Sequence, residues 1–288
     1  MRLKPSSKNL ANPVLLLLSL ALLFCPIGCQ PNNNSDFYTT NSLDEIIKKI
    51  CKEEYNIDVI VKMSQNTVWV YAPFEKVLHN DYGIIQDKFF DEETGRKMNN
   101  IFLTIGRAIM NTDSRIDFFV LTVSDINLGF DYSLIGSTLD IKKSYAGSIP
   151  FFEANRRYVE RLEPAPEAIG DKTGNHIRAS DITFGEFLGE QIPQRILRLF
   201  NEERLRRYFV TKSVTGRFED NFFYLKYNIA QIAPTTKKID VQKIILDTIT
   251  YCLKAYDFKD FAGIILENEL TQEKITLNPV AILNRKIY

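Results

Sequence analysis

The order helix, β-hairpin, helix, strand occurs twice in this chain of 288 residues, and this repetition restricts the folds that it can adopt. In the first half, residues 42–54 have one apolar face and predict an amphipathic helix. Two β-branched segments within 57–71 flank a short polar turn and predict a hairpin. A second amphipathic helix at 92–110 and an apolar strand at 116–123 complete the series.

The second half has the same order of predicted elements, with little identity to the first. A helix is predicted at 193–207 and a hairpin at 208–229, with its turn at 216–221. A helix at 240–256 and a strand at 260–266 follow. The last strand of each half begins with the dipeptide Asp-Phe.

This pattern predicts an α+β fold with two similar units. Each unit would be a small, mainly antiparallel, three-stranded sheet with helices covering one face. A chance recurrence of the order is the alternative to a duplication, because mixed α/β chains often produce such orders.

The predicted boundaries follow from the segments between the repeats. The first unit would occupy 41–162 and would include a helical extension, with helices at 137–146 and 148–161. Residues 163–181 are rich in Pro, Gly and polar residues and predict a linker loop. The second unit would occupy 182–288. His176 falls in the linker, so we expect its side chain to be solvated.

The composition is that of a globular protein and excludes some functions. Hydrophobic residues make up 45% of the chain, which is too many for a disordered protein. The 36 Lys and Arg residues balance 36 Asp and Glu residues, so the net charge gives no reason to expect nucleic acid as a partner. Only two histidines are present, which argues against a metal site with several histidine ligands. We predict no metal and no cofactor.

The first thirty residues have the layout of a secretory signal. Arg2, Lys4 and Lys8 precede an apolar run at 14–24, and no acidic residue occurs before Asp36. The run is shorter than the roughly 18–20 residues that a membrane-spanning helix needs. Export from the cytoplasm is therefore expected.

The end of this segment carries a more specific motif. Ile27, Gly28 and Cys29 resemble the lipobox of bacterial lipoproteins, although Pro26 stands where that family usually has Leu. The resemblance implies that residues 1–28 are removed as a signal peptide. It also implies that Cys29 is lipidated and attaches the protein to the membrane. An ordinary cleaved secretion signal and an uncleaved anchor are the alternatives.

The residues after the cysteine bear on location. Residues 29–40 predict the lipidated end and a flexible tether, because the polar run after Pro31 has the composition of a linker. Gln30 stands where the inner-membrane retention signal of bacterial lipoproteins has Asp. The resemblance thus implies a cell-envelope protein, on the periplasmic side of the outer membrane if the bacterium is Gram-negative.

Two cysteines, Cys51 and Cys252, lie on similar apolar helix faces in the two halves. An oxidising periplasm would permit a disulfide between them if their Cα atoms lay within roughly 7 Å. The alternative is two buried thiols in the core, where unpaired cysteines usually lie.

Five arginines make the predicted helix at 193–207 basic. They are Arg195, Arg198, Arg204, Arg206 and Arg207. Such a helix could face an anionic lipid or another polyanion. The alternative is an ordinary solvated face, because Arg198–Glu202, Glu202–Arg206 and Glu203–Arg207 are spaced for i,i+4 ion pairs.

The predicted second hairpin is unusually aromatic. A strand alternates its side chains between two faces, so these aromatic residues cannot all point into one core. Those that remain exposed would form the best partner-binding surface, for which Phe218, Phe222 and Tyr224 are the candidates.

Two functional hypotheses remain after these observations. The leading one is a non-enzymatic binding or scaffold module, anchored to the membrane by its lipid. It would hold another envelope protein or, alternatively, an apolar ligand near the membrane. It depends in part on the lack of a recognisable catalytic motif. The alternative is an extracytoplasmic hydrolase whose carboxylates come together in the fold. Its candidate residues are Asp81, Asp113, Asp117 and Asp125.

Overall fold

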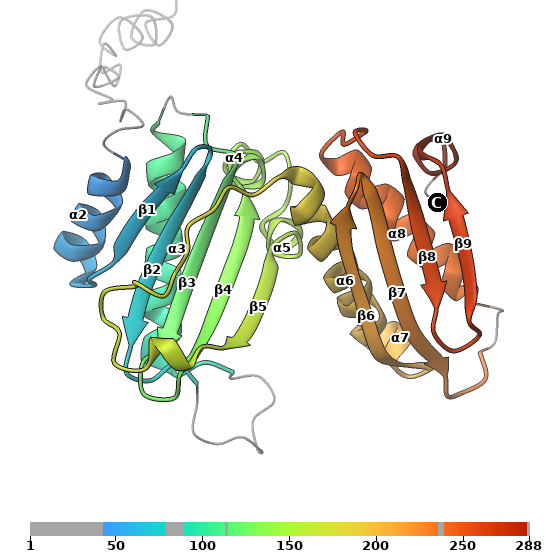
Figure 1. Ribbon diagram of the computed structural model, residues 1–288, viewed down its shortest axis with the longest axis horizontal. Coiled ribbons are helices and arrows are strands. Elements are labelled where there is room, and N and C mark those ends of the chain that lie inside the picture. Colours follow the sequence, from blue (N-terminus) through green and yellow to red (C-terminus); the bar gives the residue numbers. More distant parts are fainter. Residues whose placement is uncertain (1–42, 79–88, 113–114, 236–238, 287–288) are drawn as a thin grey trace, which may run out of the picture. The chain divides into compact units, whose positions relative to one another are not determined.

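Two mixed β-sheets packed with helices form the described part of the protein, so the fold is α+β as predicted (Figure 1). The computed structural model describes residues 43–78, 89–112, 115–235 and 239–286. All of these residues belong to one unit, Tyr38–Tyr288. Among them, no helix combines the length and the apolar character that crossing a membrane requires.

The first sheet has five strands in the order β1-β2-β3-β4-β5 within the described residues. The strands are β1 (Ile60–Ser64), β2 (Thr67–Phe74), β3 (Phe118–Asp125), β4 (Phe130–Ser137) and β5 (Val159–Pro164). Neighbouring strands are antiparallel, except that β2 and β3 are parallel. Helix α2 (Leu43–Tyr55) precedes β1, and α3 (Glu92–Met110) connects the parallel pair.

The second sheet repeats this topology with four strands in the described residues. The strands are β6 (Phe209–Glu219), β7 (Phe222–Gln231), β8 (Gly263–Asn268) and β9 (Glu273–Leu277). Here β7 and β8 are the parallel pair. Helix α6 (Phe184–Asn201) precedes β6, and α8 (Val241–Ala255) connects the parallel strands.

Shorter helices complete the described elements. They are α4 (Thr138–Tyr145), α5 (Phe151–Asn155), the 3-10 turn η2 (Pro166–Ala168), α7 (Glu203–Arg206) and α9 (Pro279–Leu283). The prediction of two similar, mainly antiparallel sheet units agrees with this arrangement. Each sheet is nevertheless larger than the three strands expected.

The prediction missed β4, β5 and β9, and it was wrong about the helix at 148–161. That helix stops at Asn155, and β5 begins at Val159. Of the β5 residues only Val159 is buried, because β5 is an edge strand whose other residues are charged or exposed. Strand β9 is also an edge strand with mostly exposed residues. Such strands lack the apolar alternation on which a sequence-based prediction depends.

The turn of the second hairpin is shorter than predicted. It lies at Asp220 and Asn221, which have φ angles of 50° and 62°, whereas 216–221 was expected to be a loop. Two consecutive residues with positive φ define the tight turn that matches the twist of paired strands. Residues 216–219 therefore extend β6 and continue its pairing with β7.

Helix α6 begins at Phe184, well before the start predicted at Pro193. A capping box determines this start, because Thr183 Oγ1 accepts a hydrogen bond from the Glu186 backbone N–H. The Glu186 carboxylate in turn accepts one from the Thr183 backbone N–H. Proline is common in a first helical turn, which made Pro193 look like a start, but here it lies buried inside the helix.

Helix α6 lies very close to β6. A Cβ atom built on Gly189 would lie 2.7 Å from the backbone nitrogen of Phe218, and one on Gly216 would lie 2.8 Å from the Gly189 carbonyl oxygen. Only glycine permits this approach of a helix to a strand, so both positions depend on the lack of a side chain.

The first sheet is covered on both faces. Strand β3 is entirely buried, and its Phe119 belongs to the core that α2 and α3 close. Its neighbour Phe118 points to the opposite face, where its ring centroid lies 4.8 Å from Phe184 and 5.3 Å from Phe187 of α6. The second unit therefore supplies part of the cover of the first sheet.

The segment 165–181 also lies on the first sheet. In Figure 1 it is the yellow chain that crosses in front of β1–β3 after η2. Lys62 Nζ, Trp69 Nε1 and Tyr71 OH each donate a hydrogen bond of 2.8 Å to a carbonyl oxygen of this segment. These bonds attach the segment to β1 and β2 along its length.

Candidate functional site

One face of the second sheet is left without a helical cover in the described part of the chain. Helices α6 and α8 lie behind β6–β9 in Figure 1 and bury the inner side chains of β7. These inner residues are Phe223, Leu225, Tyr227 and Ile229. Phe222 and Tyr224 alternate with them, so they lie on the opposite face and are only half-buried. We call this second surface the open face.

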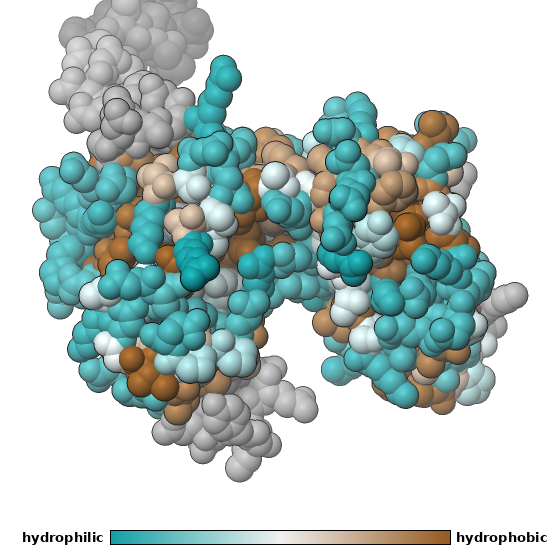
Figure 2. Space-filling model, viewed as in Figure 1, coloured by the Kyte–Doolittle hydropathy of each residue, from teal (hydrophilic) through white to brown (hydrophobic). Residues whose placement is uncertain are grey.

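The open face combines aromatic, aliphatic and charged groups. The Arg217 guanidinium lies 4.8 Å from the centroid of the Tyr224 ring, and Ile265 of β8 is paired in register with Tyr224. Lys226 and Glu267 form an ion pair of 3.3 Å on the same face. Figure 2 shows hydrophobic patches among hydrophilic ones over these strands. Tyr, Phe and Arg are the residue types enriched at protein interfaces.

Phe218 differs from the other two residues of the predicted partner surface. It pairs with Phe223 across the hairpin, with ring centroids 4.7 Å apart, and so faces the helices. Its ring also lies against Gly185 of α6. The open face thus contains Phe222 and Tyr224, while Phe218 contributes to the core.

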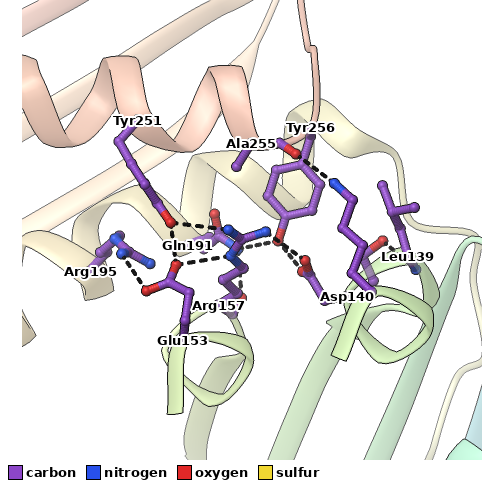
Figure 3. Close-up of polar contacts among 11 residues, drawn as sticks. Leu139, Asp140, Glu153, Arg157, Gln191, Arg195, Tyr251, Ala255 and Tyr256 are labelled. Carbon is purple, nitrogen blue, oxygen red and sulfur yellow. Dashed lines mark hydrogen bonds and ion pairs between the residues drawn. The ribbon is translucent and has the colours of Figure 1, made fainter. Parts of the chain in front are cut away.

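A buried network of charged groups joins the two halves (Figure 3). Arg157 is at its centre, with Nη1 2.9 Å from Asp140 Oδ1 and Nε 3.0 Å from Glu153 Oε1. Arg195 of α6 adds a second cation, whose Nη2 lies 3.0 Å from Glu153 Oε2. Two carboxylates and two guanidinium groups balance each other, as buried charges require.

Hydroxyl and amide groups complete the network from the second half. The Tyr251 hydroxyl donates to Glu153 at 2.6 Å, and the Tyr256 hydroxyl donates to Asp140. Gln191 Nε2 donates to the Tyr256 hydroxyl at 2.8 Å and to the backbone carbonyl oxygen of Arg157 at 2.6 Å. Helices α4 and α5 are thereby connected to α6 and α8 by direct bonds.

The network changes the pKa values of its acids in opposite directions. Burial raises the pKa of Asp140, and the hydrogen bond from Tyr256 and the charge of Arg157 only partly oppose this. Burial also acts to raise the pKa of Glu153, but bonds from Arg195, Tyr251 and Arg157 lower it overall. Every described carboxylate in the network is already paired, so the arrangement is suited to holding helices together and not to proton transfer.

The two described carboxylates of the predicted hydrolase site, Asp117 and Asp125, do not come together. Asp117 precedes β3 and Asp125 ends it, which separates them by about 25 Å at ~3.3 Å per residue. Asp117 accepts a hydrogen bond from Asn66, and the buried Asp125 accepts three from backbone N–H groups of neighbouring loops. Asp81 and Asp113 lie outside the described residues.

His176 is buried, contrary to the expectation that it is solvated. Its Nδ1 lies 2.8 Å from Asp171 Oδ2, and its Nε2 lies 3.3 Å from Asp131 Oδ2 in β4. Burial acts to raise the pKa of Asp171, but hydrogen bonds from His176 and Thr173 hold it well below its usual range.

Among the described residues, no group of three or more acidic, His or Cys side chains is arranged to hold a metal ion.

The two cysteines lie in different cores. Cys51 of α2 belongs to the core of the first sheet, and Cys252 of α8 to that of the second. Both are free thiols, so the structure does not bring them together. Burial raises the pKa of Cys51 to about 11 and that of Cys252 to about 12, which makes both thiols poor nucleophiles. Cys29 lies outside the described residues.

Comparison of the chain with protein-family models, with curated proteins and with solved structures finds no match.

Proposed function

We propose that this protein is a bacterial cell-envelope lipoprotein that binds another envelope protein without catalysing a reaction. Lipid on Cys29 would attach it to the membrane, and the open face of β6–β9 would hold the partner. The observation that carries the proposal is that Phe222 and Tyr224 are only half-buried, on a sheet face without a helical cover in the described chain.

The difference between the two sheets supports this assignment. In the first sheet, the face opposite α3 is covered by α6 and by the segment 165–181. The corresponding face of the second sheet carries half-buried aromatic side chains. Apolar area that remains in contact with water on a folded protein often marks a binding surface. A partner that covers this face would remove that apolar area from water.

The hydrolase hypothesis has less support. Asp117 and Asp125 lie at opposite ends of one strand, and both are occupied by hydrogen bonds from the chain itself. Two acids that do come close, Asp140 and Glu153, are each paired with arginine in a buried network. Two others, Asp131 and Asp171, are both paired with His176.

The anchor has a direct test. Intact-mass measurement of the membrane-extracted protein is expected to give a chain that begins at Cys29 and carries acyl groups. The Cys29→Ala variant should leave the membrane fraction, because acyl chains supply about 0.8 kcal/mol for each buried CH₂ group. An unmodified N-terminus, or full membrane retention of the variant, would contradict the proposed anchor.

The partner surface is tested by site-specific cross-linking in the bacterial envelope. A photo-reactive amino acid at Tyr224 is expected to give one discrete adduct with an envelope protein. The matched control is Val280 of α9, which is 66% exposed but does not belong to the open face. Equal labelling at both positions, or no adduct at Tyr224, would show that the open face does not bind a partner.

A further inference from the structure

A pocket of about 400 Å³ lies between α6, α7 and α8, next to the buried network. Four arginines contribute to its lining, together with two acids and an apolar wall. The arginines are Arg156, Arg195, Arg198 and Arg204. Its volume is within the range of about 300–1,000 Å³ that is usual for sites that bind small molecules.

The i,i+4 ion pairs expected along this part of the chain do not form, and three of the four pocket arginines pair with other acids. Helix α6 ends at Asn201 and Glu202 is extended, so i,i+4 spacing across this point does not bring side chains together. Glu202 instead pairs with Arg156 at 2.7 Å, and Arg198 pairs with Glu160 at 2.6 Å. The predicted pairs Arg198–Glu202, Glu202–Arg206 and Glu203–Arg207 are therefore wrong. Arg204, Arg206 and Arg207 are exposed, as expected of a solvated face.

Two of the arginines have donors that the described residues leave unused. Arg204 forms no ion pair or side-chain hydrogen bond with any described residue. Arg195 bonds Glu153 through Nη2, while its Nη1 is buried without a partner in the described part of the chain. The other acid of the lining, Asp247, already binds Lys243 and Arg285. Arg204 is exposed, so it is the arginine whose donors a ligand in the pocket can reach.

The rest of the wall is apolar. Leu199 of α6, Leu205 of α7 and Ile244 of α8 line the pocket beside the guanidinium groups. Tyr251 adds an aromatic surface, over which the Arg195 guanidinium lies 4.3 Å from the ring centroid. One ligand would thus meet cationic donors on one side and hydrocarbon on another.

We propose that this pocket binds a small organic anion, namely a carboxylate or phosphate group joined to a short apolar portion. Arg204 would donate hydrogen bonds to the anionic oxygens, because a guanidinium group matches the planar geometry of such acceptors, and Arg195 would add positive charge to the same wall. Leu199, Leu205 and Ile244 would contact the apolar portion. The pocket lies on the helix side of the second sheet, so this proposal and that for the open face can fail independently.

The test is isothermal titration calorimetry on the full chain, extracted from the membrane in a non-ionic detergent. Hexyl phosphate and hexanoate are expected to bind with one site per chain, and hexanol to give no measurable binding. Inorganic phosphate should bind more weakly than hexyl phosphate, because it lacks the apolar portion. No binding of either organic anion at millimolar concentration, or equal binding of hexanol, would overturn the proposal.

Matched variants test whether the pocket is the site. Arg204→Gln is expected to weaken binding of hexyl phosphate about tenfold or more, since it removes a charge-assisted hydrogen bond, and Arg204→Glu should weaken it further. Arg206→Gln is the control, because Arg206 lies in the same helix with the same charge but does not line the pocket. Binding that is unchanged in both Arg204 variants would overturn the assignment. So would equal losses in the Arg204→Gln and Arg206→Gln variants, provided that circular dichroism shows both to be folded.

Discussion

Replacement of Arg157 with alanine is expected to lower the free energy of unfolding by about 3–5 kcal/mol, the largest loss from any ion pair of the described chain. The Arg157 side chain is only 6% exposed, and its removal leaves the carboxylate of the fully buried Asp140 without its cation. A buried charge that loses its partner keeps the penalty of desolvation without the compensating attraction. Urea unfolding followed by circular dichroism measures the change.

Two further variants separate this cause from a general loss of contacts. Lys259→Ala breaks an exposed ion pair with Asp257 and should cost less than about 1 kcal/mol. Asp140→Asn added to Arg157→Ala should recover part of the stability, because it removes the uncompensated charge. If Arg157→Ala costs no more than Lys259→Ala, the network is not the connection between helices that we describe.

Gly189→Ala is expected to lower the free energy of unfolding by about 1–3 kcal/mol, although alanine is the better helix former. The new Cβ atom would lie 2.7 Å from the Phe218 backbone nitrogen and 3.0 Å from the Arg217 carbonyl carbon. Both are backbone atoms of β6, so the clash can be relieved only by moving α6 away from the strand.

The control for this prediction is Gly95 of α3, where alanine has room. A Cβ atom there would meet nothing nearer than the Phe90 side chain at 3.7 Å. Gly95→Ala should therefore raise the free energy of unfolding by up to about 1 kcal/mol through helix propensity alone. If thermal and urea unfolding show both variants to be stabilised equally, the close approach of α6 to β6 is not tight.

Elements with strong local signals could be predicted from the sequence. Helix α8 has a side-chain cap, since Asp240 accepts a hydrogen bond from the Lys243 backbone N–H, and it has one continuous apolar face. Helix α3 is of the same kind, with Asp91 as its cap. Their boundaries were predicted to within a residue because hydrogen bonds and burial within one segment determine them.

Elements that depend on distant contacts could not be predicted. The edge strands β5 and β9 are held by pairing with β4 and β8, and their own residues have no continuous apolar side. The start of α6 is different, because the capping box of Thr183 and Glu186 is a local signal for it, whereas Pro193 lies inside the helix.

The candidate sites also divide into residues that a local pattern predicts and residues that only distant contacts bring together. The alternation of β7 is a local property, and it indicated that some aromatic side chains must leave the core, as Phe222 and Tyr224 do. The Arg157 network brings together α4, α5, α6 and α8, and its partner Tyr256 is 116 positions from Asp140. The one signal available was an acid at position 140, within an amphipathic helix that buries it. No spacing rule links it to its partners.

The cover of the first sheet affects any attempt to divide the protein into fragments. Phe118 is buried by side chains of α6, which belongs to the second half, and β1 and β2 bind the segment 165–181. A fragment cut before residue 165 would present Phe118 and its neighbours to water and would be prone to aggregate. The halves thus resemble each other in topology, yet the first depends on the second for its solubility.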